Sequence, residues 1–199
     1  MFEIVISRFN ENLDWVNSLK IPFQIYNKGG HLELPHIVLK NIGREAQTYL
    51  HHLILKFDSL AEYTVFLQGN PHRHTRNIIS IINDLPGSLD NLQELSRGCW
   101  ALSDQVLVDE QREVEAFKVY PEDFHNAFFE IPRRRFRHAY GAQYVVHRSA
   151  IQNKPVEFFI HMHDSCSWVR HEPWSIERVW PSIFDADDKY KHKIRSFYS

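Results

Sequence analysis

The sequence predicts an α/β fold in which a mostly parallel sheet is flanked by helices. Two observations carry this prediction: strand, helix and strand patterns follow one another within the first thirty residues, and a long amphipathic helix then leads into a third apolar strand. Alternation of this kind is typical of parallel sheets, which bind ligands beyond the carboxyl ends of their strands. With 199 residues, 43% of them hydrophobic, the chain is expected to form one domain over 1–199.

The first strand is predicted at residues 2–7, where FEIVIS is rich in β-branched residues. Apolar residues at helical spacing predict a short helix within 10–20, and a second strand at 23–26 is stopped by the sequence NKGG. The clearest helix covers 44–57, because REAQTYLHHLILKF places its apolar residues on one stripe. The third strand, 63–67, follows and ends in QGNP.

The second half of the chain gives weaker signals. NIISIINDL predicts a helix after the third strand, and a turn and another short helix follow in PGSLDNLQELS. Residues 104–135 are charged and give no clear pattern, and we interpret PEDFHNAFFEIPRRR at 121–135 as a surface loop or a small lobe. The sequence AYGAQYVVHRSAI is strand-like as far as His147, and a helix is expected to start near Ser149.

Composition limits the classes of partner and the cellular location. A formal net charge of −2 gives the molecule no overall attraction to nucleic acid or anionic lipid, so neither is expected as a partner. The N-terminus resembles neither a signal peptide nor a membrane span, and Cys99 and Cys166 are expected to be reduced thiols, although one disulfide stays open. A soluble cytoplasmic protein is therefore expected. The sequence contains no P-loop, dinucleotide-binding or nucleophile-elbow motif.

Polar side chains gather where each of the three predicted strands ends. The clusters are Ser7, Arg8 and Asn10; Tyr26, Asn27 and Lys28; and Gln68, Gly69 and Asn70. In a parallel sheet these strand ends lie along one edge, so the clusters are expected to form one site. Arg8, Lys28 and Arg44 supply the positive charge with which such a site binds phosphate groups. The competing interpretation is that polar residues end strands in most proteins.

Two His-x-His pairs are candidates for a metal site. His72 and His74 follow Asn70, and HMHD at 161–164 forms a second group at what we interpret as another strand end. Neutral imidazole is a common ligand of divalent cations, and an amide oxygen can complete such a site. The competing interpretation is geometric, because alternate residues of any strand share a face.

Five stretches, ISRFNENLDWV, IYNKG, NIGREAQTYLHHL, YTVFLQGNP and WSIERVWPSIF, resemble a family of glycosyltransferase-like proteins of fungi, bacteria and large algal viruses. They are similar in particular to the N-terminal glycosyltransferase domain of a chlorella-virus enzyme that decorates the capsid glycan. The pair GREAQTYLHH and FLQGNP is the most specific part, and residues 85–135 contribute least. The resemblance leaves open whether the chain is one domain of a longer enzyme.

This resemblance implies a GT-A fold, in which a Rossmann-like sheet binds a nucleoside-diphosphate sugar. Residues 1–84 would form the nucleotide-sugar half and residues 85–199 the acceptor half. The three strand-end clusters and Arg44 would hold the donor, for which a UDP-sugar is the first guess.

The resemblance also identifies a departure from the usual GT-A pattern. Typical members place an Asp-x-Asp at the end of a central strand, where it binds Mn²⁺ or Mg²⁺ and neutralises the leaving diphosphate. Here Gln68-Gly69-Asn70 occupies that place, so a metal would have to use Asn70, His72 and His74. Without a metal, the nearby Arg and Lys side chains would have to stabilise the diphosphate.

The resemblance assigns the acceptor half as well. GAQYVVHRSAI, which contains Tyr144, resembles the strand that opens the acceptor lobe in GT-A proteins, and an acidic residue some thirty positions later is then the catalytic base. Glu177 lies at that distance between Trp174 and Trp180, whose rings suit a sugar, and Asp164 is the second candidate for the base. The structural alternative for Glu177 is an ion pair with a neighbouring arginine.

The function expected from these residues is transfer of a sugar from a nucleotide-sugar donor to a hydroxyl of a glycan or glycoprotein. Inversion is favoured because one carboxylate base suffices, and a retaining outcome stays open. Two alternatives remain. One is a nucleotide- or sugar-binding module without catalysis, which the missing Asp-x-Asp favours, and the other is a hydrolase that uses a metal bound by histidines.

Overall fold

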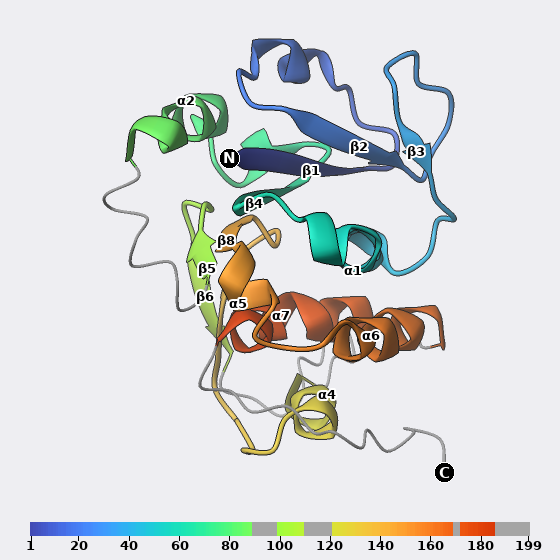
Figure 1. Cartoon of the computed structure of the whole chain (residues 1–199), viewed down its shortest axis with the longest axis vertical. Coiled ribbons are helices and arrows are strands. Elements are labelled where there is room, and N and C mark those ends of the chain that lie inside the picture. The colour runs from blue at the N-terminus through green and yellow to red at the C-terminus, as the bar shows by residue number, and fades with distance from the viewer. Residues whose placement is uncertain (89–98, 110–120, 169–171, 186–199) are drawn as a thin grey trace.

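The computed structural model describes residues 1–88, 99–109, 121–168 and 172–185, and its centre is a six-stranded mixed sheet (Figure 1). The sheet order β3-β2-β1-β4-β8-β5 is formed by Ile37–Val38, Phe23–Asn27, Phe2–Arg8, Tyr63–Gln68, Tyr144–His147 and Cys99–Ala101. Strands β1 to β4 run parallel, whereas β8 is antiparallel to both of its neighbours. The predicted α/β fold with a mostly parallel sheet is confirmed.

The strand register brings the three strand-end clusters to one edge of the sheet. Ser7, near the end of β1, lies opposite Tyr26 of β2 on one side and Gln68 of β4 on the other. Strand β8 begins at the same edge, because it runs antiparallel to β4 and pairs its first residue, Tyr144, with Phe66. Residues from four strands therefore meet where β1, β2 and β4 end.

Helices cover both faces of the sheet. One face carries α1 (Arg44–Lys56), α6 (Val156–Trp168) and α7 (Glu172–Phe184), which lie together below the sheet in Figure 1. The other face carries the 3-10 helix η1 (Asp14–Ser18) and α2 (Ile78–Asp84), whose apolar residues belong to a separate core cluster. Within the residues described, none of the helices has the length and apolar character needed to cross a membrane.

The remaining elements are short. They are the 3-10 helices η2 (Phe57–Ser59), η3 (Pro71–Arg73) and η4 (Leu85–Ser88), the α-helices α4 (Pro121–Phe128) and α5 (Arg148–Ile151), and a two-stranded antiparallel sheet of β6 (Val106–Asp109) and β7 (Phe136–Ala139). The stretch 121–135, predicted as a surface loop or small lobe, thus begins with a helix. The reason is that α4 buries Phe124 and Phe128 in the main core, so this helix is more than a surface segment.

The short helix predicted within 10–20 is present as the 3-10 helix η1, and the one predicted after α2 falls on 89–98, which lie outside the described residues. One local prediction is wrong. The group HMHD at 161–164 lies on α6 and not at a strand end. The buried side chains Phe158, Phe159, Met162 and Cys166 are spaced as in a helix, and they place this segment against α1.

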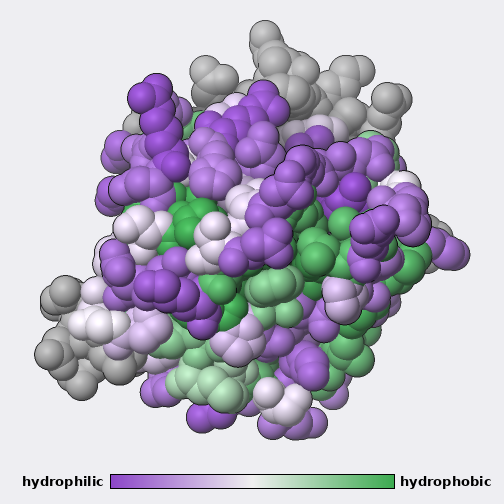
Figure 2. All heavy atoms as spheres, turned by 90° about the horizontal axis from the view of Figure 1, so that it is seen from above, coloured by the Kyte–Doolittle hydropathy of each residue, from purple (hydrophilic) through white to green (hydrophobic). Residues whose placement is uncertain are grey.

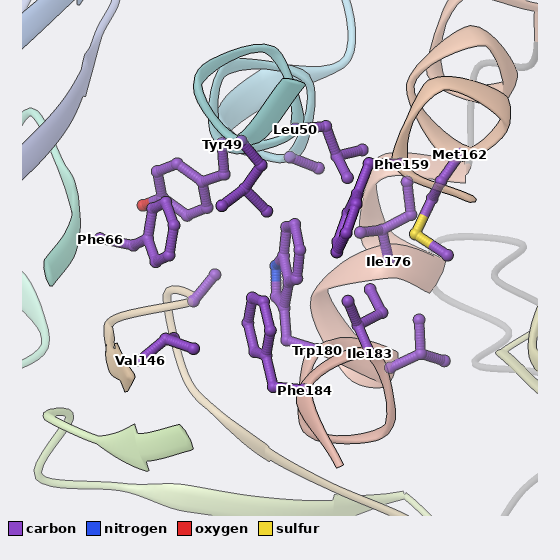
Figure 3. Close-up of a cluster of buried hydrophobic side chains, with 14 of the residues drawn as sticks. Tyr49, Leu50, Phe66, Val146, Phe159, Met162, Ile176, Trp180, Ile183 and Phe184 are labelled. Carbon is purple, nitrogen blue, oxygen red and sulfur yellow. The ribbon is translucent and has the colours of Figure 1, made fainter. Parts of the chain in front are cut away.

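The larger core cluster fills the space between the sheet and helices α1, α6 and α7 (Figure 3). Trp180 stacks on Phe184 with ring centroids 5.5 Å apart, and Tyr49 packs against Phe66 at 4.8 Å. All four side chains are almost fully buried. Large aromatic side chains contribute much of the buried area of a core, so this cluster forms a rigid base next to the sheet edge.

The surface is mainly hydrophilic on the face seen in Figure 2, where apolar residues emerge between polar ones. Three apolar side chains are exposed close to the strand ends: Phe9 follows β1, Val38 ends β3, and Ile42 precedes α1. The edge at which the strands end therefore presents apolar as well as polar groups to a ligand.

Candidate functional site

The loops after β1 and β2 are tied together by Arg8. Its guanidinium donates from Nη1 to the side-chain oxygen of Asn27 at 2.7 Å and from Nε to the carbonyl of Glu11 at 3.0 Å. The Asn10 side chain strengthens the link by accepting a hydrogen bond from the Gly30 amide at 2.9 Å. Only 8% of Arg8 is exposed, so its charge is used mainly to fix these two loops.

Ser7 and Tyr26 also face the interior of the protein. The Ser7 hydroxyl donates to Thr48 Oγ1 of α1 at 2.9 Å, and the Tyr26 hydroxyl lies 2.9 Å from Nδ1 of His52. His52 Nε2 is in turn 3.5 Å from the Glu3 carboxylate, and the hydrogen bond to His52 lowers the pKa of Glu3. These two predicted donor-binding residues therefore connect the sheet to α1 through their side chains.

Lys28 holds the turn that precedes α1. Its Nζ donates to the carbonyl of Ile42 at 2.6 Å and to the carbonyl of Arg44. Burial lowers the pKa of Lys28 to about 8, while Cys166 and Glu45 act in the opposite direction. Lys28 is thus a buried amine that fixes the backbone from which Arg44 projects.

The N-terminus of α1 presents one exposed cation and one buried carboxylate. The Arg44 guanidinium lies over the Trp174 ring at 4.9 Å from its centroid, and the Arg44 side chain is 52% exposed. Arg44 Nε is also 3.6 Å from Oε2 of Glu45, whose side chain is only 10% exposed. The free amides of a helix N-terminus favour anions, so Arg44 stands where a phosphate group would be stabilised.

Glu177 of α7 faces the same region. Its Oε1 accepts a hydrogen bond from the Gly141 amide at 3.1 Å, and its Oε2 is 4.0 Å from Nη1 of Arg178. Burial and, second, the charge of Glu45 raise the pKa of Glu177, whereas Arg178, the Gly141 amide and Arg44 lower it, and the net pKa is about 7. A carboxyl with this pKa accepts and releases protons near neutral pH.

Two residues beside these carboxyls have a backbone conformation that side chains rarely adopt. In the described part of the chain, the non-glycine residues with positive φ are Arg44, at 48°, and Ala142, at 51°. The first precedes Glu45, and the second follows the Gly141 amide that contacts Glu177. Each such residue costs about 1 kcal/mol, and such strain concentrates at functional sites. Backbone geometry and carboxyl chemistry thus indicate the same location.

The end of β4 lies close to the loop that follows β1. The Trp15 indole N–H donates to the Gly69 carbonyl at 3.1 Å, and a Cβ at Gly69 would approach Glu11 Oε2 to 2.5 Å. Gln68 is half-buried, and Asn70 is exposed. The structure therefore brings the third predicted cluster to the edge, where Gly69 permits the close approach of the loop.

The rings of His72 and His74 contact different neighbours. His72 meets Trp15 edge-on at 6.2 Å between centroids, and its Nδ1 is 3.2 Å from the Arg76 carbonyl. His74 meets the Tyr140 ring edge-on at 4.5 Å and lies against Gly141, where a Cβ would come within 2.4 Å of the imidazole. Across 1–88, 99–109, 121–168 and 172–185, no three His, Cys, Asp or Glu side chains are grouped as a metal site.

The predicted acceptor-binding residues differ in how deeply they are buried. Trp174 is half-buried and carries Arg44, whereas Trp180 is 1% exposed and belongs to the core. Tyr144 is also buried, and its hydroxyl accepts a hydrogen bond from the Ala139 amide at 2.7 Å. Asp164, the second candidate for the base, is exposed on α6 beside His163. Of these residues, Trp174 contacts the exposed Arg44 guanidinium, whereas Tyr144 is a buried neighbour of Glu177.

Two members of the site were absent from the sequence prediction. Glu45 lies in the first turn of α1, where acidic residues are common because they complement the helix dipole, so its position gave no sign of a role at the site. The Gly141 amide is a backbone group, and the sequence AYGAQY indicates only a turn. Neither contact could be inferred without the packing of α7 against this edge.

The arrangement combines a base with a cation. Glu177 can take a proton from a hydroxyl, because its pKa is raised to about 7. Arg44 can contact an anion, because half of its side chain is open to solvent. Together they could activate a hydroxyl nucleophile close to a negatively charged leaving group.

Comparison with known proteins gives a family but no activity. No curated protein matches the chain. One family model, described as a protein of unknown function, DUF3431, matches residues 4–199. Because this match covers nearly the whole sequence, the chain belongs to the DUF3431 family.

Proposed function

We propose that this chain is a glycosyltransferase of GT-A type, which transfers a sugar from a nucleoside-diphosphate sugar to a hydroxyl of a glycan or glycoprotein. The observation that carries the proposal is Glu177, a carboxyl with a pKa of about 7 at the edge where parallel strands end. Ligands of α/β sheets bind at such edges, and a base of this pKa suits deprotonation of an alcohol. The sequence resemblance to glycosyltransferase-like proteins supports the same class.

The contacts of the three predicted cations divide their roles. Arg8 and Lys28 bind loop carbonyls and side-chain oxygens of the protein, whereas the Arg44 guanidinium is half exposed above Trp174. We assign the diphosphate of the donor to Arg44 and to the N-terminal amides of α1. Arg8 and Lys28 then act by shaping the loops around that position.

The proposed reaction is a single displacement. Glu177 removes the proton of an acceptor hydroxyl, the oxygen attacks the anomeric carbon, and the bond to the nucleoside diphosphate breaks. The diphosphate leaves with the bonding electron pair, and the proton stays on Glu177 until solvent removes it. Attack from the face opposite to the leaving group inverts the anomeric carbon, which is the outcome that a single base permits.

The predicted metal ligands lie against different neighbours in the structure. Asn70 is exposed, His72 packs against Trp15 and His74 against Tyr140, so the Mn²⁺ or Mg²⁺ site at these residues stays a prediction. The proposed reaction is written without a metal. Whether a divalent cation assists the leaving group is a prediction that assays with and without Mn²⁺ would test.

The test is release of UDP from UDP-sugars by the purified chain in the presence of simple glycan acceptors. Glu177→Gln should lower the rate by roughly 10²–10⁴-fold, because it removes the base and keeps the shape. Glu157→Gln, at an exposed position on α6, is the matched control and should leave the rate unchanged. If no nucleoside diphosphate or nucleotide sugar raises the melting temperature and none is consumed, the proposal is wrong.

A binding module without catalysis is the second candidate. It is favoured by Gln68 and Asn70, which place neutral amides where related enzymes carry acids. Such a module would bind UDP or a UDP-sugar with unaltered affinity in Glu177→Gln and would release no UDP. The enzyme would show turnover in the wild-type chain and its loss in the same variant.

A further inference from the structure

Three polar side chains meet where α1 packs against α6 (Figure 1). Gln47 and His51 are four residues apart on α1, so they share one face of that helix, and His163 of α6 contacts both. Nε2 of Gln47 lies 3.1 Å from Nε2 of His163, and the rings of His51 and His163 are 6.1 Å apart between centroids. The sequence suggested His161 as the partner of His163, whereas the structure places His51 beside it and leaves His161 exposed.

The side-chain amide of Gln47 is incompletely hydrogen-bonded. Gln47 is only 5% exposed, and its Oε1 atom is buried without a hydrogen-bond partner among the residues that the structure describes. A buried oxygen in this state is destabilising, so its presence in a native protein calls for a missing partner such as a water or an ion. Beside two imidazoles, a bound cation would supply that partner.

The surroundings of His163 suit a metal ligand. Its Nδ1 lies 3.5 Å from the Asp164 carboxylate, and its Nε2 faces Gln47 on α1. Histidines that bind metals usually contact a carboxylate or carbonyl through the ring nitrogen that does not bind the metal. The side chains of His163 and His51 are both partly exposed, so a cation can reach them from solvent.

The charges around His51 allow a cation to bind. Burial, followed by the charges of His163, His52 and Lys28, lowers the pKa of His51, so its ring is mostly neutral at pH 7. The ammonium of Lys28 opposes a second cation, but two backbone carbonyls accept hydrogen bonds from it and offset part of its charge. The carboxylate of Asp164 favours a cation.

The separation of the two rings agrees with a shared ion. Zn²⁺ binds imidazole nitrogen at about 2.0–2.1 Å, which places the centroids of two rings on one tetrahedral ion roughly 5 Å apart. A movement of about 1 Å by partly exposed side chains would bring His51 and His163 from the observed 6.1 Å to that spacing.

We propose that Gln47, His51 and His163 form a binding site for a divalent transition-metal ion, with Zn²⁺ as the expected ion. Two imidazoles and the amide oxygen supply three ligands, and a water completes the tetrahedron. The ion joins α1 to α6 and uses none of the metal ligands predicted at the end of β4. The site does not depend on the proposed transferase activity.

Titration of the purified chain with Zn²⁺ tests the site, with the ¹⁵N chemical shifts of the histidine side chains and the melting temperature as readouts. Zinc should shift the ring nitrogens of His51 and His163 and should raise the melting temperature. His51→Ala and His163→Ala should each weaken zinc binding by at least roughly tenfold, since even residues that only orient a ligand contribute about 10–100-fold. His161→Ala, at an exposed position two residues away on α6, is the matched control and should bind zinc as the wild type does.

A third imidazole at Gln47 provides a test by gain of affinity. Gln47→His should bind zinc more tightly than the wild type, because histidine is a better zinc ligand than an amide and keeps the four-residue spacing from His51. Unchanged or weaker binding in a folded Gln47→His protein would overturn the three-ligand site. If the variants do not fold, the wild-type spectra decide: zinc-induced shifts confined to other histidines, such as His72 and His74, overturn the proposal, and so does the absence of any zinc-induced shift.

Discussion

The free energy of unfolding of the wild type, measured relative to that of a Lys28→Met variant, should increase with pH. Lys28 is 7% exposed, and burial lowers its pKa from 10.5 to about 8. Below pH 8 the native and the unfolded chain both carry the proton, so the cost of burying the charge is constant. Between pH 8 and 10.5 only the unfolded chain binds it, and the native state gains stability as the pH rises.

The magnitude follows from the two pKa values. From the pKa of 10.5 and the value of about 8, the stabilisation relative to pH 7 is roughly 1 kcal/mol at pH 9 and roughly 2–3 kcal/mol at pH 10. Lys28→Met removes this group and keeps a side chain of similar length. The free energy of unfolding of the wild type minus that of the variant should therefore increase by these amounts.

Urea unfolding at pH 7, 8, 9 and 10 measures that difference. Groups that titrate alike in the two proteins cancel, and Lys40→Met, at an exposed position, is the control with the same charge change. Cys166 and Glu45 also influence Lys28, so the series is repeated in a Cys166→Ala background. A difference that stays constant between pH 7 and 10 would refute the assignment of Lys28 as a buried amine with a lowered pKa.

Three further changes test other parts of the structure. Ala142→Gly should change the free energy of unfolding by less than about 1 kcal/mol, because relief of the φ of 51° offsets the loss of a buried methyl group. A loss well above that in chemical unfolding would contradict strain at this residue. Trp180→Ala should lower the free energy of unfolding by about 3–5 kcal/mol, whereas Trp174→Ala should lower it clearly less, because Trp174 is only half-buried. Similar losses in chemical unfolding would contradict this difference in burial. His52 lowers the pKa of Glu3, so the stability from this contact is present above the unfolded pKa and is lost on acidification. In acid-unfolding curves, Glu3→Gln should flatten the decline in stability below about pH 4.5. An unchanged slope would contradict this contribution of the contact.

The shared edge of the three strand-end clusters could be predicted from the sequence because it depends on strand order alone. Apolar runs that end in polar residues, separated by helical patterns, lead to a parallel sheet, and its strands end at one edge. Ser7 opposite Tyr26 and Gln68 is the direct result. The presence of cationic side chains at this edge could be predicted in the same way. The group that each cation contacts could not. Arg8 binds its neighbouring loops, a contact that depends on the folded path of those loops.

Helical periodicity accounts for two other differences between prediction and structure. Trp174 and Trp180 are six residues apart, so they point away from each other on a helix, and only Trp180 joins the buried stripe of α7 with Ile176 and Ile183. The His-x-His pair at 161–163 was predicted at a strand end. The helical spacing of the apolar residues around it explains why it lies on α6 instead. The burial of Trp180 and the position of the His-x-His pair both follow from the spacing of apolar residues once a helix is assumed. The place of Glu45 at the site depends instead on how α1 and α7 pack.

The contacts of the cations also bear on how an anion would be stabilised beside the neutral amides Gln68 and Asn70 at the end of β4. Lys28 binds the carbonyl of Arg44, and Arg44 keeps a left-handed backbone that turns its guanidinium over Trp174. A strained residue persists only where its surroundings fix it, and here a buried amine supplies that support. The positive charge at this edge is therefore held in place by the protein itself. If a diphosphate binds here, the fixed guanidinium provides the charge stabilisation that an Asp-x-Asp site obtains from its metal.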